Sequence, residues 1–122
     1  MRRALLALPL AALLGCGGGL LAPRADLTGT WSAQHVESST TLILVQVGDS
    51  VAGSGSYYRF INPPTGTMTV AGTNANALVS LTIRYDTGTT THFVGVVEDP
   101  MHMAGVERYP GGTTDSLAFA RH

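Results

Sequence analysis

The sequence contains no lysine, and charged residues of all kinds make up only 12% of its 122 positions. Its seven basic residues are all arginines, and eight acidic residues bring the formal net charge to -1. Nucleic-acid binding needs a basic patch or stripe, which this sequence lacks, so we expect no nucleic-acid partner. A hydrophobic content of 44% excludes a disordered chain, and the length suits one folded domain.

Cysteine occurs only once, at Cys16, so no disulfide can form within the chain. The sequence also lacks a hydrophobic run of the roughly 20 residues that a helix needs to span a bilayer. Residues 4–14 are apolar apart from one proline, and they follow Arg2 and Arg3. A positive start before a short apolar run is the layout of a secretory signal, so we expect residues 1–15 to be a signal peptide.

The end of this segment, Leu13-Leu14-Gly15-Cys16, resembles the lipobox of bacterial lipoproteins. The resemblance implies that Cys16 receives a diacylglycerol on its sulfur, is acylated with fatty acids such as palmitate, and becomes the first mature residue. Two or more acyl chains anchor a protein stably, so the expected partner is a membrane. The alternative is an ordinary signal peptide and a cysteine that is buried in the fold.

We expect residues 16–25 to be a flexible linker and residues 26–122 to be the folded domain. A coil of this length reaches roughly 15–18 Å, which keeps the domain close to the membrane surface. The expected location is the cell envelope. In a Gram-negative host, the resemblance and Gly17 imply the outer membrane, with the domain facing the periplasm.

From Asp26 onward, runs of β-branched and aromatic residues alternate with turn residues such as Asn74-Ala75-Asn76 and Asp99-Pro100. This pattern predicts an all-β domain. We expect strands at residues 28–36, 40–47, 51–60, 66–73, 77–85, 89–98, 102–109 and 114–121.

Short connections favour antiparallel neighbours, so the eight strands form an up-and-down meander. Closing the meander removes its two exposed edges, which predicts a small barrel. In the fifth strand Val79, Leu81 and Ile83 share the face expected to lie inside. A transmembrane barrel is the alternative, and it would need a continuous apolar band on its outward faces. The sequence disfavours it, because the expected outward faces have Thr, Ser, Arg and Asp.

The segment Asp26-Leu27-Thr28-Gly29-Thr30-Trp31, which leads into the first strand, resembles the opening of avidins, and its Gly-x-Trp is similar to the lipocalin signature. Both families are eight-stranded barrels. The resemblance implies that a basic residue of the last strand packs across Trp31, and Arg121 is the candidate. The positions that bind the biotin ureido oxygen in avidins fall on Ala33, Glu37 and Gly55, which do not match, so biotin binding is disfavoured.

Tyr57, Tyr58, Arg59 and Phe60 are the candidate ligand-binding residues, because they precede a proline-stiffened connection of the kind that gates barrel mouths. In the alternative, Tyr58 and Phe60 point inward as ordinary strand residues, Tyr57 and Arg59 point outward, and the connection is only a turn.

Metal binding and catalysis have little support in the sequence. Met101-His102-Met103 offers soft ligands that suit copper, but strand alternation places His102 on the opposite face from both methionines. We therefore expect no metal and no cofactor. There is no Gly-x-Ser-x-Gly motif, no free cysteine after lipidation and no histidine with an evident carboxylate partner, so we expect no enzyme.

The expected function is binding of a small apolar or amphipathic ligand. Expected interior positions include Gly53, Gly55, Gly95 and Gly105, and a barrel lined by glycines is under-filled unless something occupies it. The alternative is a protein-interaction or inhibitor module that acts through its loops, as in protease-inhibitor lipoproteins that resemble avidins in fold. An apolar cavity of about 300 Å³ or more would favour the first function.

Overall fold

The computed structural model describes residues 26–35, 37–60 and 65–122. The predicted signal peptide, the lipobox and Cys16 lie outside the described residues. Eight strands follow in order: β2 (Gly29–Gln34), β3 (Ser38–Val47), β4 (Ser50–Arg59), β5 (Thr65–Ala75), β6 (Leu78–Tyr85), β7 (Thr90–Asp99), β8 (His102–Arg108) and β9 (Thr114–Arg121). In these ranges, no helix has the length and apolar character to cross a membrane.

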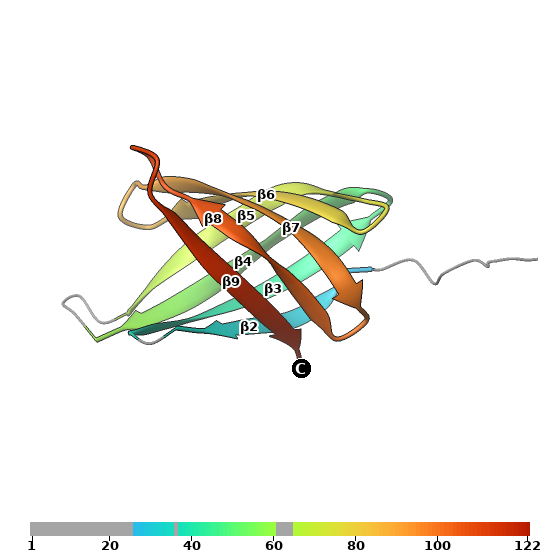
Figure 1. The fold of residues 1–122 in the computed structure, drawn as a ribbon, viewed down its shortest axis with the longest axis horizontal. Helices are drawn as coiled ribbons and strands as arrows, with labels where there is room; N and C mark the ends of the chain where they lie inside the picture. The colour runs from blue at the N-terminus through green and yellow to red at the C-terminus, as the bar shows by residue number, and fades with distance from the viewer. Residues whose placement is uncertain (1–25, 36, 61–64) are drawn as a thin grey trace, which may run out of the picture.

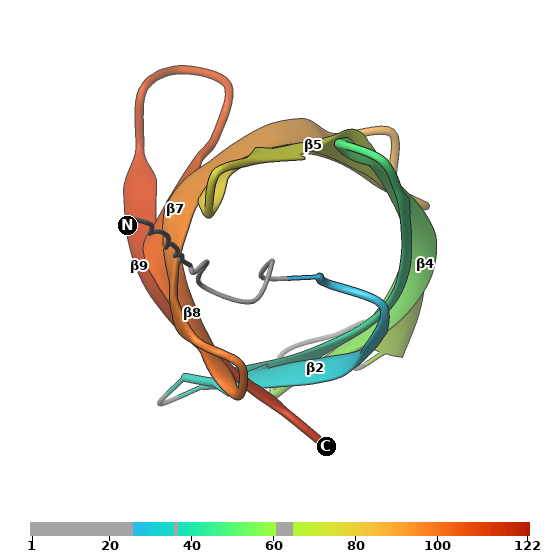
Figure 2. The ribbon, with the colours of Figure 1, turned by 90° about the vertical axis from the view of Figure 1, so that its right-hand side faces the viewer.

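The strands form a closed barrel in which each one pairs with the next in the chain (Figure 1). All pairings are antiparallel, and β9 returns to β2 with Trp31 opposite Arg121 and Ala33 opposite Phe119. Figure 2 shows the resulting ring of strands. The all-β, eight-stranded, up-and-down barrel predicted from the sequence is confirmed, and its closure leaves no unpaired sheet edge.

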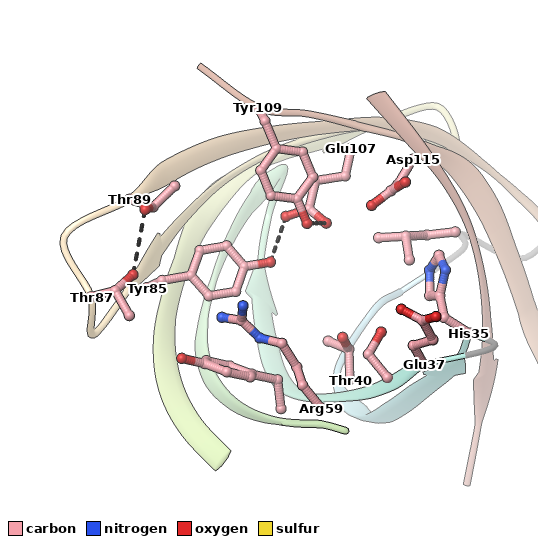
Figure 3. Close-up of a pocket in the computed structure, with 13 residues that line it drawn as sticks. His35, Glu37, Thr40, Arg59, Tyr85, Thr87, Thr89, Glu107, Tyr109 and Asp115 are labelled. Carbon is pink, nitrogen blue, oxygen red and sulfur yellow. Dashed lines mark hydrogen bonds between the residues drawn. The ribbon is translucent and has the colours of Figure 1, made fainter. Parts of the chain in front are cut away.

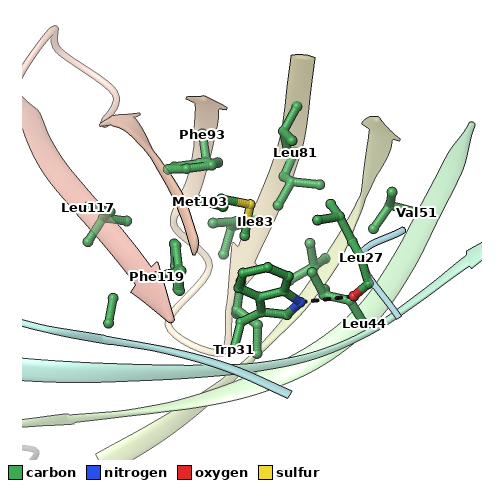
Figure 4. Packing of buried hydrophobic residues seen from close by; sticks show 14 of the residues in the cluster. Leu27, Trp31, Leu44, Val51, Leu81, Ile83, Phe93, Met103, Leu117 and Phe119 are labelled. Atoms are coloured by element: carbon green, nitrogen blue, oxygen red, sulfur yellow. Dashed lines mark hydrogen bonds between the residues drawn. The ribbon is translucent and has the colours of Figure 1, made fainter. Parts of the chain in front are cut away.

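The core consists of the inward-facing side chains of all eight strands (Figure 4). In β6 the predicted face of Val79, Leu81 and Ile83 is buried, as strand alternation requires. Phe93 and Phe119 meet edge to face, with ring centroids 5.6 Å apart. This apolar packing fills the middle of the barrel.

The N-terminal end of the described chain closes one end of the barrel. Leu27 is fully buried, and its carbonyl oxygen accepts a hydrogen bond of 2.9 Å from Trp31 Nε1. The guanidinium carbon of Arg121 lies 4.6 Å from the centre of the Trp31 ring. Arg121 also donates hydrogen bonds to the carbonyl oxygens of Thr28, Asp26 and Pro100, so it ties the two ends of the sheet together.

The structure corrects one predicted turn. Asn74 is a buried strand residue whose Nδ2 donates to Gln46 Oε1 at 3.0 Å. The turn falls instead on Asn76 and Ala77, whose φ angles are 55° and 70°. Two successive positive φ angles match the twist of a two-residue hairpin, and β5 is correspondingly longer than expected.

The glycines that were expected to leave the interior empty have a different role. A Cβ on Gly53 would lie 2.0 Å from the Ile43 carbonyl oxygen, and one on Gly105 would lie 2.2 Å from that of Val94. Neighbouring strands approach so closely there that only glycine fits. The expectation that these positions leave space is therefore wrong, because backbone occupies it.

The outward faces are less polar than expected. The large apolar residues exposed on them include Ile43, Val45, Val47, Leu78, Val94, Val96 and Val106. Several are neighbours in the sheet: Leu78 pairs with Val96, Val96 with Ala104, and Ala104 with Ala118. An apolar row therefore crosses the exterior of β6, β7, β8 and β9.

Candidate ligand-binding site

A cavity of about 310 Å³ opens at the end of the barrel opposite Leu27. Figure 3 shows the side chains that line it. The β2–β3, β6–β7 and β8–β9 connections lie at this end. Its lining residues are His35, Glu37, Ser38, Thr40, Tyr57, Arg59, Tyr85, Thr87, Thr89, Glu107, Tyr109, Asp115 and Leu117. The lining is predominantly polar and aromatic, in contrast to the apolar middle of the barrel.

Glu107 is the most deeply buried charged residue of the cavity, with 3% of its surface exposed. Its Oε2 accepts hydrogen bonds of 2.5 Å from both Tyr85 Oη and Thr91 Oγ1, and its Oε1 accepts one of 3.2 Å from Tyr109 Oη. Buried carboxylates are costly unless they are hydrogen-bonded, so these three hydroxyls stabilise Glu107 in place. In return, Glu107 fixes the two tyrosine rings.

The two tyrosines that donate to Glu107 hold their protons strongly. Burial, and then the hydrogen bond and charge of Glu107, raise the pKa of Tyr85 far above its ordinary value. Burial and the charges of Glu107 and Asp115 raise the pKa of Tyr109 to about 12. Both phenols are therefore hydrogen-bond donors at neutral pH.

Arg59 occupies another part of the cavity wall. Its guanidinium carbon lies 4.6 Å from the centre of the Tyr57 ring, within the range of a cation–π contact. Tyr57 is itself held in place, because its hydroxyl donates to Asp86 Oδ1 at 3.0 Å. Tyr57 and Tyr85 also meet edge to face at 5.4 Å. The position of Arg59 therefore depends on a chain of contacts that reaches the β6–β7 turn.

Asp86 provides a pH test of this chain of contacts. Hydrogen bonds from the Thr67 backbone N–H and from Tyr57 hold the pKa of Asp86 below its ordinary value. A lowered pKa in the folded state adds stability above the pKa of the unfolded state, and this stability is lost as pH falls through the folded value. Wild type should therefore lose more stability than Asp86→Asn between about pH 5 and pH 2.

Urea denaturation at a series of pH values measures this difference. Asp49→Asn is the matched control, because Asp49 is exposed and its side chain makes no hydrogen bond within the described ranges. If Asp86→Asn shows the same acid dependence as wild type, then Asp86 does not hold Tyr57 as its carboxylate.

The structure separates the four candidate ligand-binding residues into two pairs. Tyr57 and Arg59 line the cavity, whereas Tyr58 and Phe60 are outside it, with 45% and 69% of their surfaces exposed. The alternative in which Tyr58 and Phe60 point inward is therefore wrong. Strand alternation explains the difference, because Val51 is buried in the same strand and residues two apart share a face.

Sequence reasoning missed Glu107, Tyr85 and Tyr109 as members of the site. The signal was present in the predicted eighth strand, where alternation from the apolar Met103 places Glu107 on the inward face. An acidic residue at an inward position is unusual and indicates a polar site.

The histidines and acidic residues that the structure describes form no metal site, but one histidine has a carboxylate partner. No group of three or more His, Cys, Asp or Glu side chains in the described ranges could hold a metal ion. His102 Nδ1 lies 2.9 Å from Asp99 Oδ1, a carboxylate partner that sequence analysis did not recognise. This pair is exposed at the β7–β8 turn, on the far side of the barrel from the cavity.

Comparison with known proteins suggests no function for this chain, so the geometry of the cavity is what bears on its function. No protein-family model matches the chain, and no curated protein or solved structure is significantly similar to it.

Proposed function

We propose that this chain is a lipid-anchored protein of the cell envelope that binds a small amphipathic ligand in the cavity at the open end of its barrel. The cavity itself is the main support. At about 310 Å³ it is large enough for a small molecule, and its wall combines tyrosine rings with fixed polar groups such as Glu107 and Arg59. The lining is polar and aromatic where an apolar cavity was expected, which favours an amphipathic ligand over an apolar one, because precisely placed polar groups fix a ligand's orientation.

Binding is favoured over catalysis by the state of the polar groups. Both oxygens of Glu107 already accept hydrogen bonds from protein hydroxyls, so Glu107 is suited to orient neighbours rather than to remove a proton. The raised pKa of Tyr85 likewise favours a hydrogen-bond donor over a base or nucleophile. We propose that the protein has no enzymatic activity and needs no cofactor.

The direction in which the cavity opens supports an aqueous source for the ligand. Asp26 and Leu27 lie at the closed end. The cavity is at the other end, where the β2–β3, β6–β7 and β8–β9 connections contribute to its lining, and Figure 1 shows these two ends of the barrel. If Cys16 anchors the chain through the short segment before Asp26, the closed end faces the membrane. The ligand would then enter from the side away from the bilayer, which suits a water-soluble amphipathic molecule.

Filling the cavity tests the binding proposal. Thr40 lines the cavity from β3, so Thr40→Trp is expected to place an indole in the ligand volume. Native mass spectrometry of the full-length protein, mixed with a small-molecule extract of the cell envelope, should show a bound molecule on wild type. The variant should show at least a tenfold weaker signal.

Thr73→Trp is the matched control, because Thr73 is exposed on the outward face of β5. This variant should bind as wild type does. A wild-type protein that retains no small molecule, or equal binding by both tryptophan variants, would contradict the proposal.

The anchor has a separate test. Cys16→Ala should leave an uncleaved or soluble precursor, because the resemblance makes Cys16 both the acyl acceptor and the residue that defines cleavage. Membrane fractionation measures the result, with Gly18→Ala in the linker as the control that stays attached. Normal processing and stable membrane retention of Cys16→Ala would remove the argument for an anchor.

Protein interaction through the loops is a second candidate function. Tyr58 and Phe60 are exposed near the open end of the barrel, and their rings meet edge to face at 5.6 Å. Exposed aromatic residues are enriched in protein interfaces. We favour the cavity, because protein contacts hold its Arg59 and Glu107 in fixed positions in the lining.

A further inference from the structure

Opposite charges face each other across the cavity. Arg59 ends β4 and Glu107 lies in β8, and strands four apart in a closed barrel of eight lie on opposite walls. Within the described residues, Arg59 and Glu107 form no ion pair with each other or with a third residue. Figure 3 shows the guanidinium beside Tyr85, with Asp115 farther along the wall. The cavity is therefore bipolar.

The Arg59 wall is suited to a carboxylate. The guanidinium is half-buried and stacked on Tyr57, and it makes no hydrogen bond to any residue that the structure describes. All five of its N–H groups are therefore available, and stacking limits their orientation. A planar guanidinium held in this way binds carboxylates through two parallel hydrogen bonds.

The Glu107 wall is suited to a cationic donor. Glu107 Oε1 accepts a single hydrogen bond, from Tyr109 at 3.2 Å, and a carboxylate oxygen can accept a second. Tyr109 presents an aromatic ring beside this charge, away from Arg59, and aromatic faces attract ammonium groups. Asp115 pairs with Glu107 across β8 and β9 and adds a second carboxylate to this wall, with no side-chain hydrogen bond within the described ranges. Glu37 adds a third carboxylate to the lining, at the β2–β3 connection.

We propose that the ligand is a compact zwitterion, with a carboxylate that binds Arg59 and an ammonium group at the opposite end that binds beside Glu107. This inference rests on the proposed function and specifies its ligand class. A simple anion would meet three carboxylates in the lining, and a simple cation would be repelled by Arg59. A molecule with both charges, separated by a small apolar or aromatic body, complements both walls.

Three probes of matched size test the inference. 4-(Aminomethyl)benzoate has both charges, 4-methylbenzoate has only the acid, and 4-methylbenzylamine has only the amine. Calorimetric titration of the full-length protein should show the zwitterion binding at least tenfold more tightly than either of the others. Equal or tighter binding of a singly charged probe would overturn the inference.

Arg59→Gln tests the carboxylate end. It should weaken 4-(aminomethyl)benzoate and 4-methylbenzoate at least tenfold and should not weaken 4-methylbenzylamine. Arg108→Gln is the control, because Arg108 is exposed outside the cavity. Glu107→Gln should weaken the two amine-bearing probes, and Asp115→Asn, at an exposed position, gives the same test if Glu107→Gln does not fold.

The outcomes separate the inference from the function on which it rests. If none of the three probes binds, but wild type retains an envelope molecule that Thr40→Trp loses, the zwitterion inference fails and the cavity function stands. If Arg59→Gln behaves like Arg108→Gln, the carboxylate assignment is wrong. If no small molecule of either kind binds, both proposals fail.

Discussion

Replacing Trp31 with alanine is expected to lower the free energy of unfolding by about 3–5 kcal/mol. The indole is fully buried, donates a hydrogen bond to the Leu27 carbonyl and lies under the Arg121 guanidinium. Its loss therefore removes buried apolar area, leaves a cavity and frees the segment that closes the barrel. Chemical denaturation of the full-length protein measures the effect.

The contact between Trp31 and Arg121 should also be visible as coupling. Arg121→Ala should cost distinctly less than Trp31→Ala, because its hydrogen bonds are exposed and water can replace them. The double variant should lose less than the sum of the two, by about 0.5–2 kcal/mol for a cation–π contact. Arg84→Ala, at an exposed outward position, is the control that should add independently. Additive losses for Trp31 and Arg121 would mean that β2 and β9 do not meet there.

Gly105→Val is expected to destabilise the fold by about 3 kcal/mol, at the upper end of overpacking effects. A Cβ at this position would lie 2.2 Å from the Val94 carbonyl oxygen and 2.5 Å from Gly95 Cα. Both atoms belong to the backbone of β7, so no rotation of a side chain relieves the clash. The two strands must separate, which breaks hydrogen bonds of the barrel.

Ala104→Val, one residue earlier, is the matched control. Ala104 is only partly buried and lies on the outward face, so placing the same valine side chain there should cost within about 0.5 kcal/mol of zero. Urea denaturation compares the two variants. A neutral or stabilising Gly105→Val would show that the interior contains open space at Gly105, as the sequence alone suggested.

The candidate site was only partly predictable for a related reason. Residues 57–60 can be recognised as a candidate from the sequence, because three aromatic residues and an arginine are consecutive there. Which of its side chains line the cavity depends on the inward face of β4, and the structure selects Tyr57 and Arg59. Glu107 lies 48 positions after Arg59 in the sequence, and only closure of the barrel brings β8 opposite β4.

The sequence by itself determined the fold class and the strand plan. Alternation such as that of Val79, Leu81 and Ile83 is a property of neighbouring residues, and turn residues mark where each strand ends, so both can be recognised locally. Only the tertiary structure decided what fills the barrel. Whether a glycine such as Gly105 leaves space or admits a neighbouring strand depends on how closely the strands approach. The bipolar cavity likewise exists because closure sets Arg59 and Glu107 on facing walls, and no local sequence pattern specifies which residues of distant strands share a cavity.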